Sequence, residues 1–420
     1  MNDLSPYRKY LDRINYFCLM AVVITLPYAL YLPLNSFCVI LFLSSWLLTG
    51  RISFSNKLMF LYASLFFIYF LGWLLSNNKS EGAFEIQKKL SLLIFPIVLA
   101  IIPALSQKQI RTLLVSFLLS CSIITLGCVA YALFQYFSNH NAAHFSNQSL
   151  SGIIGMHANY LAMYIAFSIF ILAFFNKELL LLLGNSLAGK IGLIAWIFYL
   201  LLFLFLLSAR IEILAFCTIS ILTILVRSYR KGKIINAIGL IMLLLTICSC
   251  FIYFNKENRE RFKEAINYKS QYGIEKQWGG RAERILIWDC CLDIIKANPL
   301  AGVGIGNSQN ELQKCYQSKN YGPLLYWPNA QYNAHNQYFQ TAIDLGMIGL
   351  LVLLINFIVS FYIAIKHRNL LFISFIFIFA FSCFTESMLE RQNGIIFYSL
   401  FNSLFVFHFK EKEENTLPSP

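Results

Sequence analysis

Charged residues are scarce in this sequence. Only 13% of its 420 residues are Asp, Glu, Lys or Arg, whereas 58% are hydrophobic and the mean hydropathy is +0.63. Soluble domains carry about 25% charged residues, so the composition excludes an ordinary soluble protein and indicates a membrane protein. The apolar-polar alternation of a membrane β-barrel is also missing. Helices are therefore expected to satisfy the backbone hydrogen bonds in lipid.

Patterns of metal ligands are absent as well. The eleven Cys residues form no Cys-x-x-Cys pair and no cluster with His at ligand spacing, so no metal site is predicted. Most of them lie in apolar segments, where they are expected to pack as small apolar residues. The exceptions are Cys290, Cys291 and Cys315 in a polar segment. In an oxidising compartment, one of the adjacent pair could bridge to Cys315.

Long apolar runs recur along the chain. A helix needs about 20 apolar residues to cross a hydrocarbon core of about 30 Å. We therefore predict an all-α, polytopic membrane protein with about 12 transmembrane helices. The expected spans are residues 14–32, 35–50, 58–75, 90–105, 112–137, 153–175, 189–208, 210–227, 234–254, 337–365, 370–386 and 394–409.

The distribution of Lys and Arg predicts the orientation of these helices. Arg8, Lys9 and Arg13 precede the first span, which lacks a small-residue cleavage site, so its start is expected to remain in the cytoplasm. Cationic residues then recur in every second loop, and both termini are predicted to be cytoplasmic. The net charge of +13 mostly reflects this asymmetry, so no nucleic-acid partner is predicted. The short loops of the opposite side hold Lys79, Lys88, Lys89, Arg210 and Arg391.

One large polar segment interrupts the spans and is predicted to be external and partly helical. The chain is accordingly divided into helices 1–9 with short loops (1–254), the large loop (255–336), helices 10–12 (337–409) and a cytoplasmic tail (410–420). Within the loop, a helix is expected from about Arg281 to Lys296. Its apolar face is predicted to consist of Ile285, Trp288, Cys291, Leu292 and Ile295.

Arginines stand at two external positions. Arg281 and Arg284 lie three residues apart at the start of the predicted loop helix, and a helix N-terminus with two guanidiniums can bind phosphate. The alternative is a solvated first turn in which Arg284 pairs with an acid such as Asp289. Arg210 and Glu212 lie between two apolar segments, where a charge is costly and is usually retained for function. The alternative for Arg210 is a snorkelling side chain that marks the interface.

His335 ends the external loop directly before the tenth span. A neutral imidazole can accept a proton from a sugar hydroxyl near neutral pH. The alternative is a His that caps a helix or lies in an aromatic interface with Tyr332 and Tyr338. Further along the span, Gly346 and Gly349 are one turn apart, which would let another helix approach closely.

The sequence resembles a known family at these residues. His335-Asn336, nine residues, and then Gly346-Met347-Ile348-Gly349 is similar to the motif of the bacterial O-antigen ligases, which share a superfamily with the O-antigen polymerases. The resemblance extends to the number of spans, the large periplasmic loop before the motif, and the glycines of NPLAGVGIG. The arginines that such ligases use correspond best to Arg210 and Arg284, with Arg281 as a competitor of Arg284. The resemblance also places Arg281 and Asn336 among the substrate-binding residues.

The resemblance implies transfer of an O-polysaccharide from undecaprenyl diphosphate to a sugar of lipid A-core, at the periplasmic face of the inner membrane. His335 would accept the proton of the acceptor hydroxyl, and the arginines would bind the diphosphate, so that neither a metal nor another cofactor is needed. Direct displacement at the anomeric carbon predicts inversion. An O-antigen polymerase, a transporter of lipid-linked polysaccharide and a structural partner in envelope assembly are the alternatives.

Overall fold

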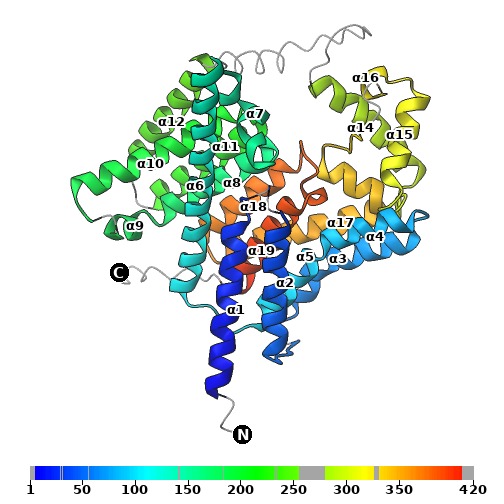
Figure 1. Ribbon diagram of the computed structural model, residues 1–420, viewed down its shortest axis with the longest axis horizontal. Coiled ribbons are helices and arrows are strands. Elements are labelled where there is room, and N and C mark those ends of the chain that lie inside the picture. The colour runs from blue at the N-terminus through cyan, green and yellow to red at the C-terminus, as the bar shows by residue number, and fades with distance from the viewer. Residues whose placement is uncertain are drawn as a thin grey trace.

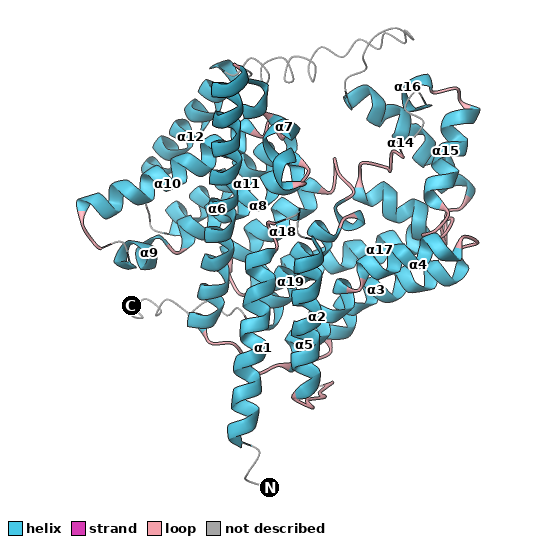
Figure 2. Ribbon diagram, in the orientation of Figure 1, coloured by secondary structure: helices cyan, strands magenta, loops and turns pink. Residues whose placement is uncertain are grey.

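The computed structural model describes residues 5–408 apart from 255–279, 326–330 and the single positions 29, 31, 55, 141, 183, 231 and 233. Within this part of the chain, Figure 2 shows helices and loops and no strand. The predicted all-α class is confirmed, and the chain is a helical membrane protein. Part of the predicted external loop and the predicted tail lie outside the described residues.

Each expected span falls on a helix, although the lengths differ. The helices concerned are α1 (Ser5–Thr25), α2 (Leu32–Leu48), α3 (Leu58–Leu75), α5 (Ser91–Ile101), α6 (Gln107–Asn139), α8 (Ala158–Phe174), α10 (Leu187–Leu206), α11 (Arg210–Arg230), α12 (Ile234–Phe254), α17 (Gln337–Lys366), α18 (Leu370–Ser382) and α19 (Gln392–Phe407).

Five of the described helices are long and apolar enough to cross a membrane alone, namely α3, α6, α10, α11 and α17. A sixth candidate is a broken span, in which the segment Asn147–Ile154 and α8 meet at 85°. By contrast, α5 has 11 residues and α18 has 13, which is shorter than a full crossing requires.

The C-terminal helices form the centre of the molecule. Figure 1 shows α18 and α19 in the middle of the view, and α17 beside α3 and α4. On one side α17 packs on α3 and α19 on α5, and on the other α18 packs on α8 and α11. Phenylalanine rings fill the interior between them, as in the edge-to-face contact of Phe117 and Phe401, whose centroids are 5.0 Å apart.

Segments predicted to lie on one side of the membrane meet one another. Arg51 forms an ion pair of 2.8 Å with Asp12, and both were predicted to be cytoplasmic. At the other end, Lys89 of α4 (Lys79–Lys89) is fully buried. It donates hydrogen bonds to the Leu389 carbonyl and to Glu390 in η4 (Met388–Glu390). The leaflet that each end faces remains a prediction.

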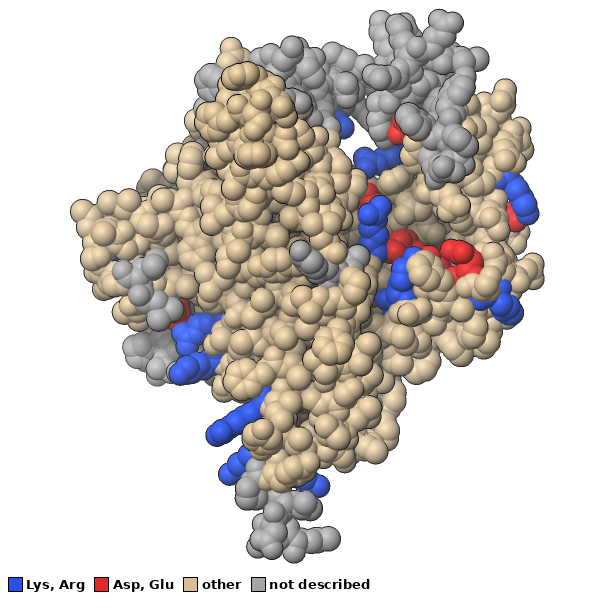
Figure 3. Space-filling view, viewed as in Figure 1, with Lys and Arg blue, Asp and Glu red and all other residues tan. Residues whose placement is uncertain are grey.

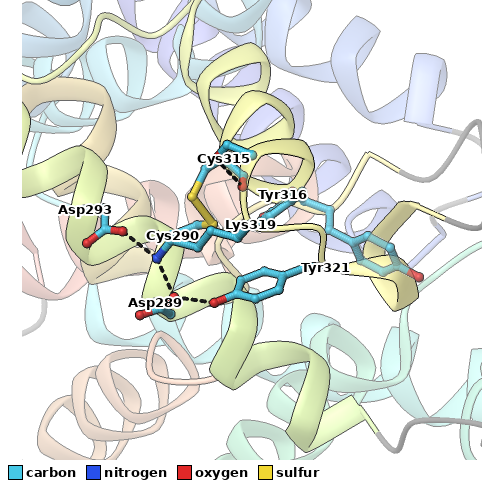
Figure 4. Close-up of a disulfide and its surroundings, with 9 residues drawn as sticks. Asp289, Cys290, Asp293, Cys315, Tyr316, Lys319 and Tyr321 are labelled. Carbon is cyan, nitrogen blue, oxygen red and sulfur yellow. Dashed lines mark hydrogen bonds and ion pairs between the residues drawn. A yellow bond between two sulfur atoms is a disulfide. The ribbon is translucent and has the colours of Figure 1, made fainter. Parts of the chain in front are cut away.

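The described part of the predicted external loop is a small helical unit with its own core, called the external unit below. It contains α14 (Gly280–Ala297), α15 (Ser308–Ser318) and α16 (Gly322–Leu325), and it lies above α4 and α17 in the view of Figure 1. The predicted helix from about Arg281 to Lys296 is confirmed by α14. A disulfide joins Cys290 to Cys315 and so links α14 to α15, which confirms the predicted bridge (Figure 4).

The apolar face predicted for α14 is confirmed only in part. Cys291 is buried, and Trp288 and Ile295 pack against the core of the unit, but Leu292 is 45% exposed. The other buried positions are Leu286, Ile287, Cys290 and Ile294. The buried face is turned toward Cys290 because this residue is bonded to α15. Spacing alone fits either face, since both sets recur at three and four residues.

A break in α17 attaches this unit to the membrane helices. Gly346 has φ 67° and ψ −166°, so the hydrogen-bond pattern of α17 is interrupted there. Neighbouring backbone groups bond instead to residues 299–306, here called the glycine loop. The Met347 amide donates to the Pro299 carbonyl at 2.8 Å, and the Val303 and Gly304 amides donate to carbonyls of α17 at 2.8 and 3.0 Å. These bonds satisfy groups that a break would leave unpaired.

The close approach predicted at Gly346 is present, but its partner was wrong. A Cβ at this position would lie 2.1 Å from the Leu300 carbonyl oxygen, which belongs to the glycine loop and not to a helix. A Cβ on Gly349 would meet Leu345 of its own helix at 2.2 Å. Gly346 therefore leaves room for the glycine loop, and Gly349 leaves room for the Leu345 side chain of its own helix.

We expect Gly346→Ala to lower the unfolding temperature in detergent by several degrees. The methyl group would overlap the glycine loop, and a positive φ costs a residue other than glycine on the order of 1–3 kcal/mol. Gly127→Ala on α6 is the matched control, because its added Cβ meets nothing within 4 Å. Equal unfolding temperatures for the two variants would contradict the structural role of the break.

Candidate functional site

His335 lies at the start of α17 in a constrained backbone conformation. Its φ is 43°, in the left-handed region, and its amide donates to the Asn333 side chain at 3.0 Å. The ring Nδ1 lies 3.4 Å from Oε2 of Glu386. An ionised carboxylate can only accept hydrogen bonds, so this contact favours the tautomer with its proton on Nδ1. Nε2 can then accept a proton from a substrate. The side chain is 27% exposed and can be reached from outside.

The capping role considered for His335 belongs to the next residue. Asn336 is the N-cap of α17, and its side chain accepts hydrogen bonds from the Tyr338 and Phe339 amides. Its Nδ2 donates to the Phe384 carbonyl at 3.0 Å, which ties the start of α17 to the loop after α18. The structure thus gives Asn336 a structural task, and its predicted part in substrate binding remains a prediction. His335 does lie near an aromatic ring, with centroids 6.3 Å from Tyr332.

Glu386 is the carboxylate in the middle of the site. It lies between α18 and η4 and is 3% exposed. Burial raises the pKa of this carboxyl, but the hydrogen bond from His335 and the favourable electrostatic interactions with His335, His157 and the Arg284 guanidinium outweigh burial and leave the pKa below its usual value. Glu386 therefore stays ionised and provides a fixed negative charge beside the imidazole.

Arg284 reaches the site from the external unit. Trp288, one turn further along α14, donates from its indole nitrogen to the Ala334 carbonyl at 3.0 Å, next to His335. The alternative in which Arg284 pairs with Asp289 was wrong. Asp289 instead accepts from Lys319 and Tyr321, as Figure 4 shows. Those two hydrogen bonds lower the pKa of Asp289. Among the described residues, Arg284 has no ion pair.

The beginning of α11 lies at the same place. Arg210 is its first residue and is half-buried, and Glu212 is 1% exposed. The Glu212 carboxylate is within electrostatic reach of both Arg284 and Glu386. The first turn of α11 therefore approaches the residues around His335. The side chain of Arg281 lies outside what the structure describes, so the choice between Arg281 and Arg284 is left to experiment.

Two further titratable residues border the cluster. His157, at the N-cap of α8, lies within electrostatic reach of Glu386, His335 and Arg391. Glu283 lies beside Arg284 in sequence, and its carboxyl interacts with both His335 and Arg284. Partial burial raises the pKa of Glu283, against the opposing effect of these two side chains.

The site contains charges of both signs at one end of the molecule. Figure 3 shows Lys, Arg, Asp and Glu side chains gathered in a hollow between the helical body and the external unit, whereas much of the remaining face is uncharged. In the described part of the chain, no group of three or more His, Cys, Asp or Glu is placed to hold a metal ion. The cluster brings a guanidinium, which can bind a phosphate oxygen, close to an imidazole that a buried carboxylate orients.

One family model matches part of the chain. The O-antigen ligase family model matches residues 193–354, a range that includes Arg210, Arg284 and His335. The match supports a place in the O-antigen ligase/polymerase superfamily. None of the curated proteins gives a significant match. The matched segment thus relates this helical membrane protein to glycosyltransferase-like enzymes that act on lipid-linked sugars.

Sequence reasoning missed Glu386 and His157. Glu386 lies in FTESMLER, a charged segment between two apolar spans on the same side as Arg210. A charge at the membrane border is costly and is usually retained for function, which is why Arg210 was singled out. Glu386 is also a charge at a membrane border and could have been found in the same way. His157 in GMHANYL carries no comparable signal, because the break between α7 (Asn147–Ser151) and α8 is not visible as a change in composition.

Proposed function

We propose that this protein is an O-antigen ligase. It transfers an O-polysaccharide from undecaprenyl diphosphate to a sugar hydroxyl of lipid A-core, in the periplasm and at the outer face of the inner membrane. Both termini then lie in the cytoplasm, and the bundle crosses the bilayer with about 12 helices. The observation that carries the proposal is the hydrogen bond between His335 and Glu386, a carboxylate that also lies within electrostatic reach of the Arg284 guanidinium.

His335 acts as the general base. Nε2 takes the proton of the acceptor hydroxyl while the hydroxyl oxygen attacks the anomeric carbon of the donor. The bond from that carbon to the diphosphate oxygen breaks on the opposite side, so the configuration inverts. Glu386 fixes the ring and stabilises the imidazolium that forms, as a buried carboxylate does for a catalytic histidine in other enzymes.

The arginines stabilise the leaving diphosphate. As the bond to the anomeric carbon breaks, negative charge grows on the phosphate oxygen that was bonded to this carbon. A guanidinium can bind two phosphate oxygens at once. Arg284 is the principal ligand, with Arg210 at the membrane border and Arg281 in the same helical turn as further candidates. These cations supply the positive charge that a divalent metal supplies in many other transferases.

His335→Ala should reduce transfer by at least about 100-fold, because a general base contributes roughly 10²–10⁴-fold. The assay uses purified protein in vesicles with lipid-linked polymer and lipid A-core acceptor, without ATP or added metal, and measures polymer-capped core on gels. His367→Ala, an exposed histidine at the other end of α17, is the control and should be fully active. Full activity of His335→Ala would remove this residue from the mechanism. Lengthened lipid-linked chains as the only product would identify a polymerase instead.

Glu386→Gln should lower the maximal rate by roughly 10–100-fold, in the range seen when a partner that orients a functional histidine is removed. The Gln amide can still reach Nδ1 of His335, but it carries no charge to stabilise the imidazolium that forms in the reaction. We therefore expect kcat to fall while KM for both substrates changes little. The exposed Glu81→Gln is the control. An unchanged kcat in Glu386→Gln would contradict the role of Glu386.

Arg284→Ala should lower kcat/KM for the donor by on the order of 10²–10³, the usual loss on removing one group that stabilises developing charge. Arg284→Lys should recover only part of it, because an ammonium lacks the planar fork. Arg230→Ala, at the exposed far end of α11, is the control. If Arg281→Ala lost activity while Arg284→Ala did not, Arg281 would be the loop arginine of the mechanism.

A further inference from the structure

A polar pocket lies apart from the His335 cluster. It forms where the α3–α4 connection meets the start of α15, and its volume is about 550 Å³. None of its lining residues belongs to the cluster described above. The lining consists of Asn77, Asn78, Asn307, Asn310, Glu311, Gln313, Lys314 and Gln317.

Side-chain amides dominate this pocket. Six of the eight lining residues are Asn or Gln, and the other two, Glu311 and Lys314, pair with each other at 2.7 Å. The charges of the lining side chains therefore cancel, and the lining surface is mainly polar. A lipid tail would find little apolar surface there, and a phosphate would find Lys314 already paired with Glu311. Amides offer both donors and acceptors, which is what sugar hydroxyls require.

The floor of the pocket is fixed by backbone contacts. The Asn78 amide donates to the Asn307 side chain at 3.1 Å, and Asn307 in turn donates to the Val303 carbonyl at 2.8 Å. Behind them, a Cβ on Gly306 would lie 2.2 Å from the Asn78 carbonyl oxygen. The glycine loop and the α3–α4 connection are thus in close contact. The shape of the pocket is therefore set before any ligand binds.

The rim of the pocket has unused hydrogen-bonding groups. The side chains of Asn77, Asn310 and Gln317 form no hydrogen bond within the described part of the protein. Asn310 and Gln317 are two turns apart on α15 and exposed, and Asn77 is exposed on the α3–α4 connection. A ligand between them could bond to both elements at once.

We propose that this pocket binds a neutral segment of oligosaccharide. The proposal rests on the proposed function, since it names a second place where a glycan of the reaction is held. Ser308, which follows Asn307, lies close to Asp344 of α17, nine residues after His335. Nine helical residues span about 14 Å, so this side of the pocket is well separated from His335. The bound sugars therefore belong to a chain that extends several units from the reacting hydroxyl or anomeric carbon.

The test compares Asn310→Ala/Gln317→Ala with the wild-type protein in two measurements. Binding of two lipid-free probes, core oligosaccharide and O-polysaccharide, is measured by titration calorimetry. Transfer kinetics are measured with each lipid-linked substrate varied in turn. We expect one probe to bind about tenfold more weakly to the variant and KM for the corresponding substrate to rise by the same factor, with kcat unchanged. The substrate whose KM rises identifies the source of the glycan.

Asn139→Ala removes an exposed amide at the end of α6 and should change neither measurement. Equal binding of both probes by the variant and the wild type would overturn the proposal, as would wild-type protein that binds neither. A lowered kcat with unchanged KM would also contradict it, because remote sugar binding acts on affinity. Absence of transfer in the wild type, with probe binding that depends on the pocket, would overturn the proposed function and leave the glycan site standing.

Discussion

The contact between the glycine loop and the broken turn of α17 is the constraint on which the arrangement of the site depends. Gly302 and Gly346 both have a φ of 67°, and a Cβ on either would collide with backbone atoms of the other segment. The break exposes amides and carbonyls of α17, and the loop satisfies them. Because α14 ends just before this loop and α15 begins just after it, the external unit is held over the start of α17. Arg284 therefore approaches His335 although 50 residues separate them in sequence.

The electrostatics of the site follow from burying one carboxylate beside a guanidinium and two imidazoles. An isolated buried charge costs several kcal/mol, and the interactions of Glu386 with His335, His157 and Arg284 offset part of that cost. The same arrangement orients the imidazole of His335 through its Nδ1. A second buried pair, Lys89 with Glu390, joins α4 to the segment that carries Glu386. The end of the bundle that carries the site is thus held by polar contacts, whereas aromatic and aliphatic packing holds the middle.

Much of this could be predicted from the sequence, for reasons that differ among residues. The helices follow from apolar runs, and Arg210, Arg284 and His335 stood out because charges and titratable rings are rare at a membrane border. The break at Gly346 could not be predicted, since a Gly-x-x-Gly is equally consistent with a helix contact. The buried face of α14 was predicted only in part because the deciding factor was the bond from Cys290 to α15, which spacing does not reveal. Glu386 was missed although, like Arg210, it is a charged residue at the border of an apolar span.

The central claim is that the imidazole and the loop guanidinium share one anion site at the external end of the bundle. The most direct measurement is a cryo-electron microscopy structure in lipid nanodiscs with undecaprenyl diphosphate bound. The account predicts phosphate oxygens within hydrogen-bonding distance of Arg284, with the ring of His335 facing the space beside the diphosphate. A diphosphate bound at the end where α1 begins, or remote from both side chains, would contradict it.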